Sequence, residues 1–224
     1  ARLRGVEIEY QKRIGSWFNG KFNFTYAIAT GKSSTSDNGY LVAVTGAGEN
    51  LNEKFLSWDK PFQLSANLYF NAEKGQGLFG FGKNILDDIS LKTRIFYQSG
   101  KRYTQQLLVG YLDDGRPEYA PDLNNINGEV GENWFWVNLD IDKYFYVNSL
   151  QFDVSLSITN LFNTLNSTII NPVTGTAYEY GQQTLNFVNN PLYPDVQAPI
   201  TPYPYNPSRY LTPTNIQFGI SMKF

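Results

Sequence analysis

The chain has 224 residues, and its 18 basic and 20 acidic side chains give a net charge of −2. This balance supplies no basic surface for nucleic acid, so we expect no nucleic-acid partner. The absence of cysteine and histidine excludes disulfides, thiolate catalysis and Cys/His metal sites. No apolar run approaches the ~18 residues of a membrane-spanning helix. We therefore expect neither an enzyme nor a bound cofactor or metal. The 16 Tyr, 16 Phe and 19 Gly residues favour β-structure with many turns.

Apolar and polar residues alternate with a period of two in seven segments of the chain, a pattern typical of β-strands. In the sixth segment, for example, Phe152 and Val154 alternate with Gln151 and Asp153. Each segment therefore has one apolar face and one polar face that carries the charges. The pattern predicts antiparallel strands at 6–11, 21–28, 62–70, 90–98, 134–142, 150–159 and 216–224.

Alternation alone fits both a soluble β-sandwich and a membrane barrel, which differ in whether the apolar face meets a protein core or lipid. Segments of about nine residues are long enough to cross a bilayer when tilted. The four tryptophans, Trp17, Trp58, Trp134 and Trp136, lie at segment ends, as in the aromatic girdles of membrane barrels. These features favour an antiparallel transmembrane β-barrel. A secreted β-sandwich that binds glycans through Tyr-rich loops and a small self-contained barrel with a structural role are the alternatives.

The connections between the segments alternate in length. Those at 31–61, 99–133 and 159–214 are long, the first and fifth segments are followed by short ones, and 71–88 is intermediate. Outer-membrane barrels have short periplasmic turns and long extracellular loops. The first segment then runs toward the periplasm and the C-terminus is periplasmic. Because bacterial barrels have an even number of strands, we expect at least one further strand before Arg2, on this or another polypeptide.

The C-terminal segment ends in a polar–x–Gly–x–x–apolar–x–aromatic pattern formed by Gln217, Gly219, Met222 and Phe224. The pattern resembles the C-terminal β-signal of outer-membrane proteins, which implies recognition by the barrel-assembly machinery. An edge strand with unpaired backbone groups is suited to strand addition on such a partner. An ordinary last strand of a sandwich is the alternative.

Several short motifs in order along the chain resemble those of TonB-dependent outer-membrane receptors. They are Gly5-Val6-Glu7, Trp58-Asp59, Tyr97-Gln98-Ser99-Gly100 with Tyr103-Thr104, Val137-Asn138-Leu139-Asp140 with Lys143, Asn160-Leu161-Phe162-Asn163, and Asn171-Pro172-Val173-Thr174-Gly175.

The resemblance implies a barrel of about 22 strands with a plugged lumen, of which residues 1–224 would form the last seven strands, without the plug. It implies an outer-membrane location, lipid contact, coupling to the TonB complex through the plug, and uptake of a siderophore, cobalamin, glycan or peptide. A surface lipoprotein is a further candidate partner of the extracellular loops.

The last long connection is rich in proline and tyrosine, with seven of the chain's 11 prolines between Pro191 and Pro213. Proline stiffens a loop, and exposed tyrosine supplies contact area at low entropic cost. Our hypothesis is that this loop lines or caps a ligand vestibule, and the alternative is Pro–Tyr packing that only orders the loop. The candidate ligand-binding residues are Tyr193, Tyr203, Tyr205, Arg209 and Tyr210.

Overall fold

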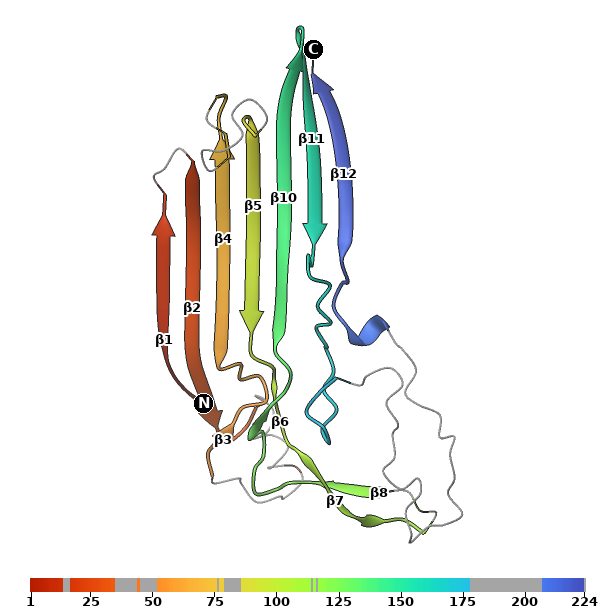
Figure 1. The fold of residues 1–224 in the computed structure, drawn as a ribbon. Coiled ribbons are helices and arrows are strands. Elements are labelled where there is room, and N and C mark those ends of the chain that lie inside the picture. The colour runs from red at the N-terminus through yellow and green to blue at the C-terminus, as the bar shows by residue number, and fades with distance from the viewer. Residues whose placement is uncertain are drawn as a thin grey trace.

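The computed structural model is all-β and antiparallel, and it describes residues 1–13, 17–34, 44, 52–75, 77–78, 86–113, 115, 117–177 and 207–223. Its main sheet has seven long strands that lie side by side in chain order (Figure 1). These strands are β1 (Arg2–Lys12), β2 (Phe18–Gly31), β4 (Phe62–Ala72), β5 (Ile89–Gln98), β10 (Trp134–Val147), β11 (Leu150–Thr159) and β12 (Asn215–Lys223). A 3₁₀ turn at Pro207–Arg209 precedes β12. The described part of the chain contains no helix that could cross a membrane.

Each of the seven predicted segments forms one long strand of the main sheet, but the expected count of seven strands is wrong. The described residues form twelve strands, because five short ones lie in the long connections. Strands of two to six residues are too short to show a reliable alternation. They are β3 (Lys54–Phe55), β6 (Arg102–Tyr103), β7 (Gln106–Tyr111), β8 (Pro117–Pro121) and β9 (Glu129–Val130).

The strand register brings most apolar residues of the seven long strands to one face of the sheet. Directly opposite residues of an antiparallel pair lie on the same face. The rows across the sheet are therefore mainly apolar or mainly polar, and we call the two sides the apolar face and the polar face. One row of the apolar face consists of Ile8, Phe24, Leu64, Tyr97 and Phe135. The next-but-one row consists of Gly20, Leu68, Thr93, Leu139, Ile158 and Ile216.

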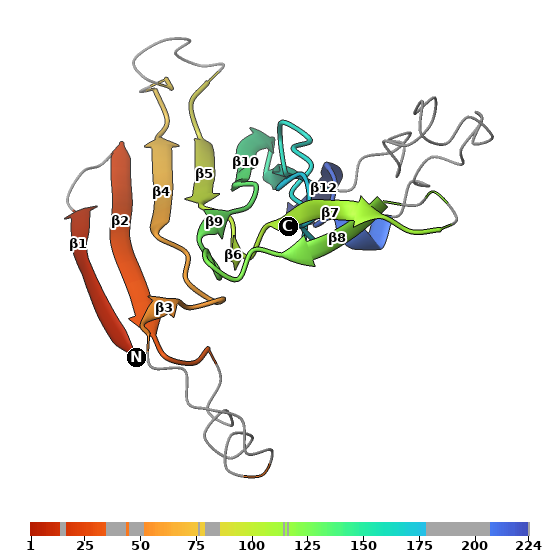
Figure 2. The same cartoon turned by 90° about the horizontal axis from the view of Figure 1, so that it is seen from below.

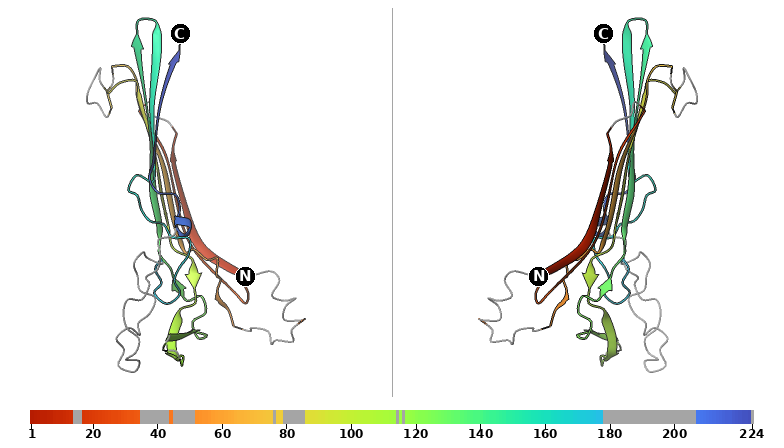
Figure 3. Two further views of the ribbon diagram at one scale, coloured as in Figure 1. Left: turned by 90° about the vertical axis from the view of Figure 1, so that its right-hand side faces the viewer. Right: turned by 90° about the vertical axis from the view of Figure 1, so that its left-hand side faces the viewer.

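The sheet is a single layer. Among the described residues, strands make extensive contacts only with their hydrogen-bonded neighbours, and edge-on views show no second sheet on either face (Figure 3). The buried hydrophobic residues are correspondingly few and mostly small: Ala29, Leu56, Ala66, Ala72, Val137 and Ala177. On the edge strands, side chains such as Ile8 (52% exposed) and Phe218 (67%) are open to solvent. The sheet therefore lacks the core that stabilises a two-layer domain.

Short and long connections lie at opposite ends of the strands (Figure 1). The connection between β10 and β11 is shorter than expected, because the alternation continues to Val147 and only Asn148 and Ser149 form the turn. Asn148 adopts a φ of 55°, a left-handed conformation that asparagine tolerates better than most residues. The intermediate connection, 73–88, lies at this same short-connection end.

A charged side chain, Lys143, lies on the apolar face near the short-connection end, in register with Ile89 and Val154. Its Nζ lies 3.5 Å from the Oδ1 atom of Asp87 and also donates a hydrogen bond to the Asp87 backbone oxygen. The backbone N–H of Gly75 donates to Asp87 Oδ2 over 2.9 Å. Asp87 therefore neutralises the lysine and closes the base of the 73–88 connection.

The pKa of Asp87 is lowered from its ordinary value of 3.8, first by the hydrogen bond from the Gly75 backbone and further by the Lys143 ammonium. Protonation of Asp87 weakens both contacts. We expect wild type to be more stable than Asp87→Asn above pH ~4, and the difference to shrink as the pH falls further. Denaturant unfolding in detergent at several pH values measures this difference in the free energy of unfolding. A difference that stays constant between pH 7 and pH 3 would contradict the assignment.

Candidate functional site

The apolar face carries two groups of aromatic rings separated by aliphatic rows. Near the long-connection end, Phe62 packs edge-on against Phe24 and Tyr97, with ring centroids 5.2 and 5.3 Å away. At the short-connection end, Phe18 stacks on Phe70 over 4.8 Å and Phe145 on Phe152 over 5.3 Å. The two groups have the spacing and placement of interfacial aromatic girdles.

The tryptophans expected in aromatic girdles do not share one face of the sheet. Trp17 packs against Phe18 and Phe70, in the aromatic group at the short-connection end. Trp134 and Trp136, however, lie on the polar face, in register with Gln98 and Phe96. Proximity to a strand end does not identify a girdle residue, because neighbouring positions on a strand point to opposite faces.

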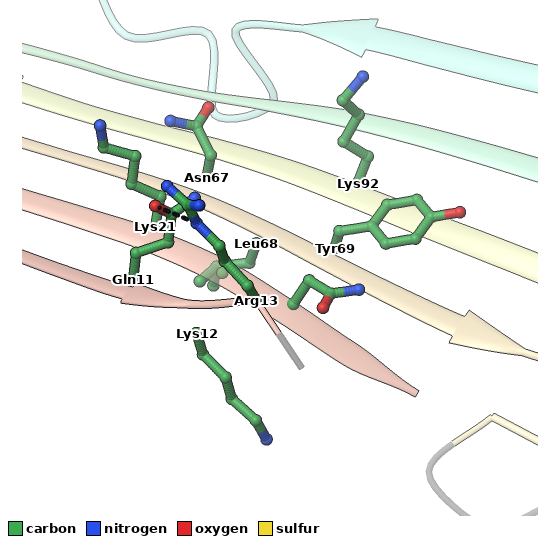
Figure 4. Close-up of a pocket in the computed structure, with 10 residues that line it drawn as sticks. Gln11, Lys12, Arg13, Lys21, Asn67, Leu68, Tyr69 and Lys92 are labelled. Carbon is green, nitrogen blue, oxygen red and sulfur yellow. Dashed lines mark hydrogen bonds between the residues drawn. The ribbon is translucent and has the colours of Figure 1, made fainter. Parts of the chain in front are cut away.

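The polar face holds a basic depression on β1, β2, β4 and β5, with a cavity volume of about 340 Å³ (Figure 4). Lys21, Asn67, Tyr69 and Lys92 lie on one side of the strands in this view, whereas Lys12 and Leu68 point to the other side. Lys21 pairs with Glu9 over 3.1 Å. On β10 and β11 the charges of the polar face are acidic instead: Asp140, Asp142 and Asp153.

A buried ion pair at the long-connection end joins two of the long connections, the one between β2 and β4 and the one between β5 and β10. Arg102 Nε donates to Asp59 Oδ2 over 2.9 Å, and only 9% and 3% of these two side chains are exposed. Asp59 also accepts the backbone N–H of Ala29 at the end of β2, while Arg102 donates to the carbonyl of Gly128 and stacks over Phe55 at 3.8 Å. The aspartate of the Trp-Asp motif thus meets the arginine that follows the Ser-Gly motif.

The Ser-Gly motif ends β5 where the two ends of the β5–β10 connection come into close contact. Ser99 exchanges hydrogen bonds with the backbone of Phe62. A Cβ on Gly100 would lie 2.2 Å from the carbonyl oxygen of Gly131, so only glycine fits there. The segment that follows pairs Tyr103 with Glu129, and burial, with a smaller effect of the Glu129 charge, raises the pKa of Tyr103.

Lys60 lies beside this junction, and its Nζ donates to the Gln98 side chain over 2.7 Å. The ammonium also lies 4.7 Å from the ring centroid of Trp134. Burial, followed by repulsion from Lys101, lowers the pKa of Lys60. This lysine bridges the start of β4 to the aromatic residues of the polar face.

The Asn-Leu-Phe-Asn motif ends β11 through Asn160, which is 2% exposed and has a φ of 52°. Its side-chain Nδ2 donates to the carbonyls of Thr164 and Thr212, and its Oδ1 accepts the backbone N–H of Thr164. Asn163 also has a positive φ and accepts the backbone N–H of Thr214. The motif therefore fixes the last long connection where it leaves β11 and where it returns to β12.

Asn166 extends the sheet beyond the end of β11 by imitating a strand residue. Its side-chain Oδ1 accepts the backbone N–H of Phe135 over 2.7 Å, and its Nδ2 donates to the Phe135 carbonyl over 3.0 Å. Trp134 Nε1 donates a hydrogen bond to the carbonyl of Ser167, the residue that follows Asn166. A single amide side chain thus satisfies both backbone groups of β10 at this point.

The candidate ligand residues fall mostly outside the described part of the chain. Tyr193, Tyr203 and Tyr205 belong to residues 178–206, which are not described. The backbone carbonyl of Arg209 accepts hydrogen bonds from the N–H and hydroxyl of Thr168, and Tyr210 forms a β-bridge with Ser167. These two residues lie where the last connection docks on 167–168, next to the long-connection end of the sheet.

Three of the four residues in the C-terminal pattern are described, and Phe224 is not. Gln217 and Gly219 lie on the polar face opposite Ser157 and Ser155, and Met222 lies on the apolar face opposite Phe152. A Cβ on Gly219 would lie 2.6 Å from the Ser155 hydroxyl, a contact that rotation of the serine relieves. Packing in this sheet therefore gives only a weak reason for glycine at 219. The outer edge of β12 has no strand partner among the described residues.

The described residues hold no cluster of three acidic side chains with the geometry of a metal site. Comparison of the chain with known protein families, with curated proteins and with solved structures finds no match. The resemblance to TonB-dependent receptors therefore stays a prediction from short motifs. The sequence did not reveal the Asp59–Arg102 pair, because its partners are 43 positions apart.

We expect Arg102→Met to lower the free energy of unfolding by about 3–5 kcal/mol, since it leaves the Asp59 carboxylate buried and unpaired. Denaturant unfolding in detergent measures the loss. Arg94→Met is the matched control, because Arg94 pairs with Asp140 over 3.6 Å with half of its side chain exposed and should lose less than about 1 kcal/mol. Equal losses in the two variants would show that the buried pair has no special role.

Replacing Asn160 with alanine should destabilise the protein by about 2 kcal/mol more than replacing Asn163. Both variants put alanine at a positive φ, so the backbone cost is shared. Only Asn160→Ala removes the partner of the part-buried N–H and carbonyl groups of Thr164. Hydrogen exchange of the Thr164 amide, compared in both variants, reports the effect locally. Similar protection in the two variants would contradict this role.

Proposed function

We propose that this chain forms part of the wall of an outer-membrane transporter that takes up a large or scarce nutrient with energy from the TonB system. The observation that carries the proposal is the single-layer sheet whose register separates an apolar face from a charged face. The cargo classes implied by the motifs are siderophores, cobalamin, glycans and peptides.

The apolar face has the dimensions of a lipid-facing surface. Phe135 and Phe145 are ten positions apart on β10, a distance of about 34 Å at ~3.4 Å per residue. At a strand tilt of about 40° this corresponds to about 26 Å of depth, close to the ~25 Å apolar band of outer-membrane barrels. Near the short-connection ring group, Lys12 reaches the rings of Trp17 and Phe18, 5.4 and 5.1 Å away, as a snorkelling lysine does at an interface.

The polar face and the two sheet edges fit the inside and the seams of a larger barrel. The polar face carries charged and amide side chains that a water-filled lumen tolerates. Both outer strands, β1 and β12, are open at one edge in the described structure. Unpaired backbone groups at a sheet edge cannot stay unsatisfied in lipid, so the proposal requires further strands to pair with β1 and β12.

The long connections are anchored to the sheet, which supports an extracellular location for the long-connection end. Asp59, Arg102 and Asn160 fix the bases of all three long connections to the sheet. The β7–β8 hairpin lies beyond this end of the sheet (Figure 1) and in front of it in the view from below (Figure 2). Rigid bases allow loops to present side chains to a ligand. The periplasm then lies at the short-connection end.

The soluble β-sandwich reading has less support. A sandwich buries the inner faces of two packed sheets, whereas no second sheet covers the apolar face within the described ranges. A soluble protein with this surface would expose far more contiguous apolar area than soluble monomers usually do.

Cysteine accessibility tests the proposal, and the natural chain contains no cysteine that would interfere. Asn67 and Leu68 are adjacent on β4 but point to opposite faces (Figure 4). In isolated outer membranes, we expect a water-soluble thiol reagent to label Asn67→Cys at least about tenfold faster than Leu68→Cys, because lipid excludes the reagent.

Denaturation of the membranes provides the control, since both variants should then be labelled equally. Equal labelling in intact membranes, or recovery of the full polypeptide in the soluble fraction, would refute the membrane wall. Removing the energising inner-membrane complex should leave the labelling unchanged but stop active uptake. Uptake that persists would refute the TonB-dependent part of the proposal.

A further inference from the structure

Two aromatic rings are stacked on the polar face, where charged and amide side chains prevail. The rings of Phe96 on β5 and Trp136 on β10 lie 4.0 Å apart with an interplanar angle of 23°. They occupy directly opposite positions in the register. An aromatic surface on a face that meets water gains little from packing alone, and it offers a platform for the face of a ring-shaped ligand.

A cavity of about 190 Å³ adjoins Trp136 on the side of β10 away from β5, and its lining consists of Trp136, Thr159, Asn160, Asn166, Leu211 and Thr212. At ~30 Å³ per water molecule it has room for about six waters. That volume suits one six-membered ring and is below the ~300 Å³ of sites for drug-sized ligands. It lies at the long-connection end, where a ligand would enter under the proposed topology.

The cavity is lined by two asparagine side chains that the protein holds in place and by two threonine hydroxyls that are available to a ligand. The amides of Asn160 and Asn166 are held by hydrogen bonds to the protein, so they define the shape of the cavity. The hydroxyls of Thr159 and Thr212 have no hydrogen-bond partner among the described residues. Trp136 and Leu211 supply an apolar wall, and none of the lining side chains is charged.

We propose that this cavity binds one neutral pyranose ring of a glycan, with a C–H face of the sugar against Trp136 and its hydroxyls on Thr159 and Thr212. The slightly positive C–H groups of a sugar face complement the negative face of an indole ring. A charged ligand would lose its hydration without a counter-charge in the lining. A purely aromatic ligand would stack on Trp136 but leave both threonine hydroxyls unpaired. The inference rests on the proposed function, because it takes the polar face as the surface that cargo meets.

The test measures binding of methyl α-glucopyranoside to the full polypeptide, purified in a detergent without a sugar headgroup, by ligand-detected saturation-transfer NMR. We expect saturable binding that Trp136→Leu weakens at least tenfold. Thr159→Val combined with Thr212→Val should weaken it similarly while preserving the side-chain shapes. Trp17→Leu is the matched control and should bind like wild type, because Trp17 lies with the aromatic rings of the apolar face.

Leu211→Trp, which fills the cavity without removing the Phe96–Trp136 stack, should also abolish binding. The inference is overturned if these cavity variants bind the glucoside like wild type, or if the protein does not bind it at all. Equal, Trp136-dependent binding of phenol or of methyl glucuronide would overturn the choice of a neutral sugar. Thiol labelling of Asn67→Cys and Leu68→Cys tests the membrane location independently. If the labelling agrees with a membrane location but no sugar binds, only the proposed sugar site is refuted.

Discussion

Lateral hydrogen bonding between neighbouring strands is the interaction on which the rest of this structure depends. With no second layer among the described residues, the sheet lacks the hydrophobic core that normally offsets the entropy cost of folding. What holds the register is the antiparallel ladder, continuous from β1 to β12. A shift of one residue in any pair would move apolar side chains to the charged face, so the ladder and the two-faced pattern stabilise each other.

The ends of the sheet are fixed by polar contacts of two kinds. At the long-connection end, the Asp59–Arg102 pair and the Asn160 amide are buried and form hydrogen bonds with several parts of the chain. At the short-connection end, Asp87 holds Lys143 and the Gly75 backbone. Because the satisfied polar groups tie separate connections together, they give local rigidity where the sheet offers no core. Rigid loop bases next to a polar face are what a binding surface at that end requires.

The structure shows what several of the motifs that resemble those of TonB-dependent receptors do in this fold. The aspartate of Trp-Asp, the glycine of Ser-Gly and the first asparagine of Asn-Leu-Phe-Asn all lie at the long-connection end and all shape connections. None of them belongs to the apolar face. The cavity beside Trp136 is built on the same frame, since Asn160 lines it while holding the turn. Asn160 thus both fixes the last long connection and lines the proposed sugar site.

The sequence by itself determined the seven long strands and the separation of their faces, because the period of two is local and needs no partner strand to be read. It did not determine the short strands: β3 pairs with the end of β2, and β6 to β9 arise when parts of one connection pair with each other. The alternation also puts Trp134 and Trp136 on the polar face, but it does not predict that Trp136 meets Phe96. Only the tertiary structure brought Asp59 to Arg102 and Thr159 to Thr212, since contacts between distant residues depend on strand order and register, which a local pattern does not specify.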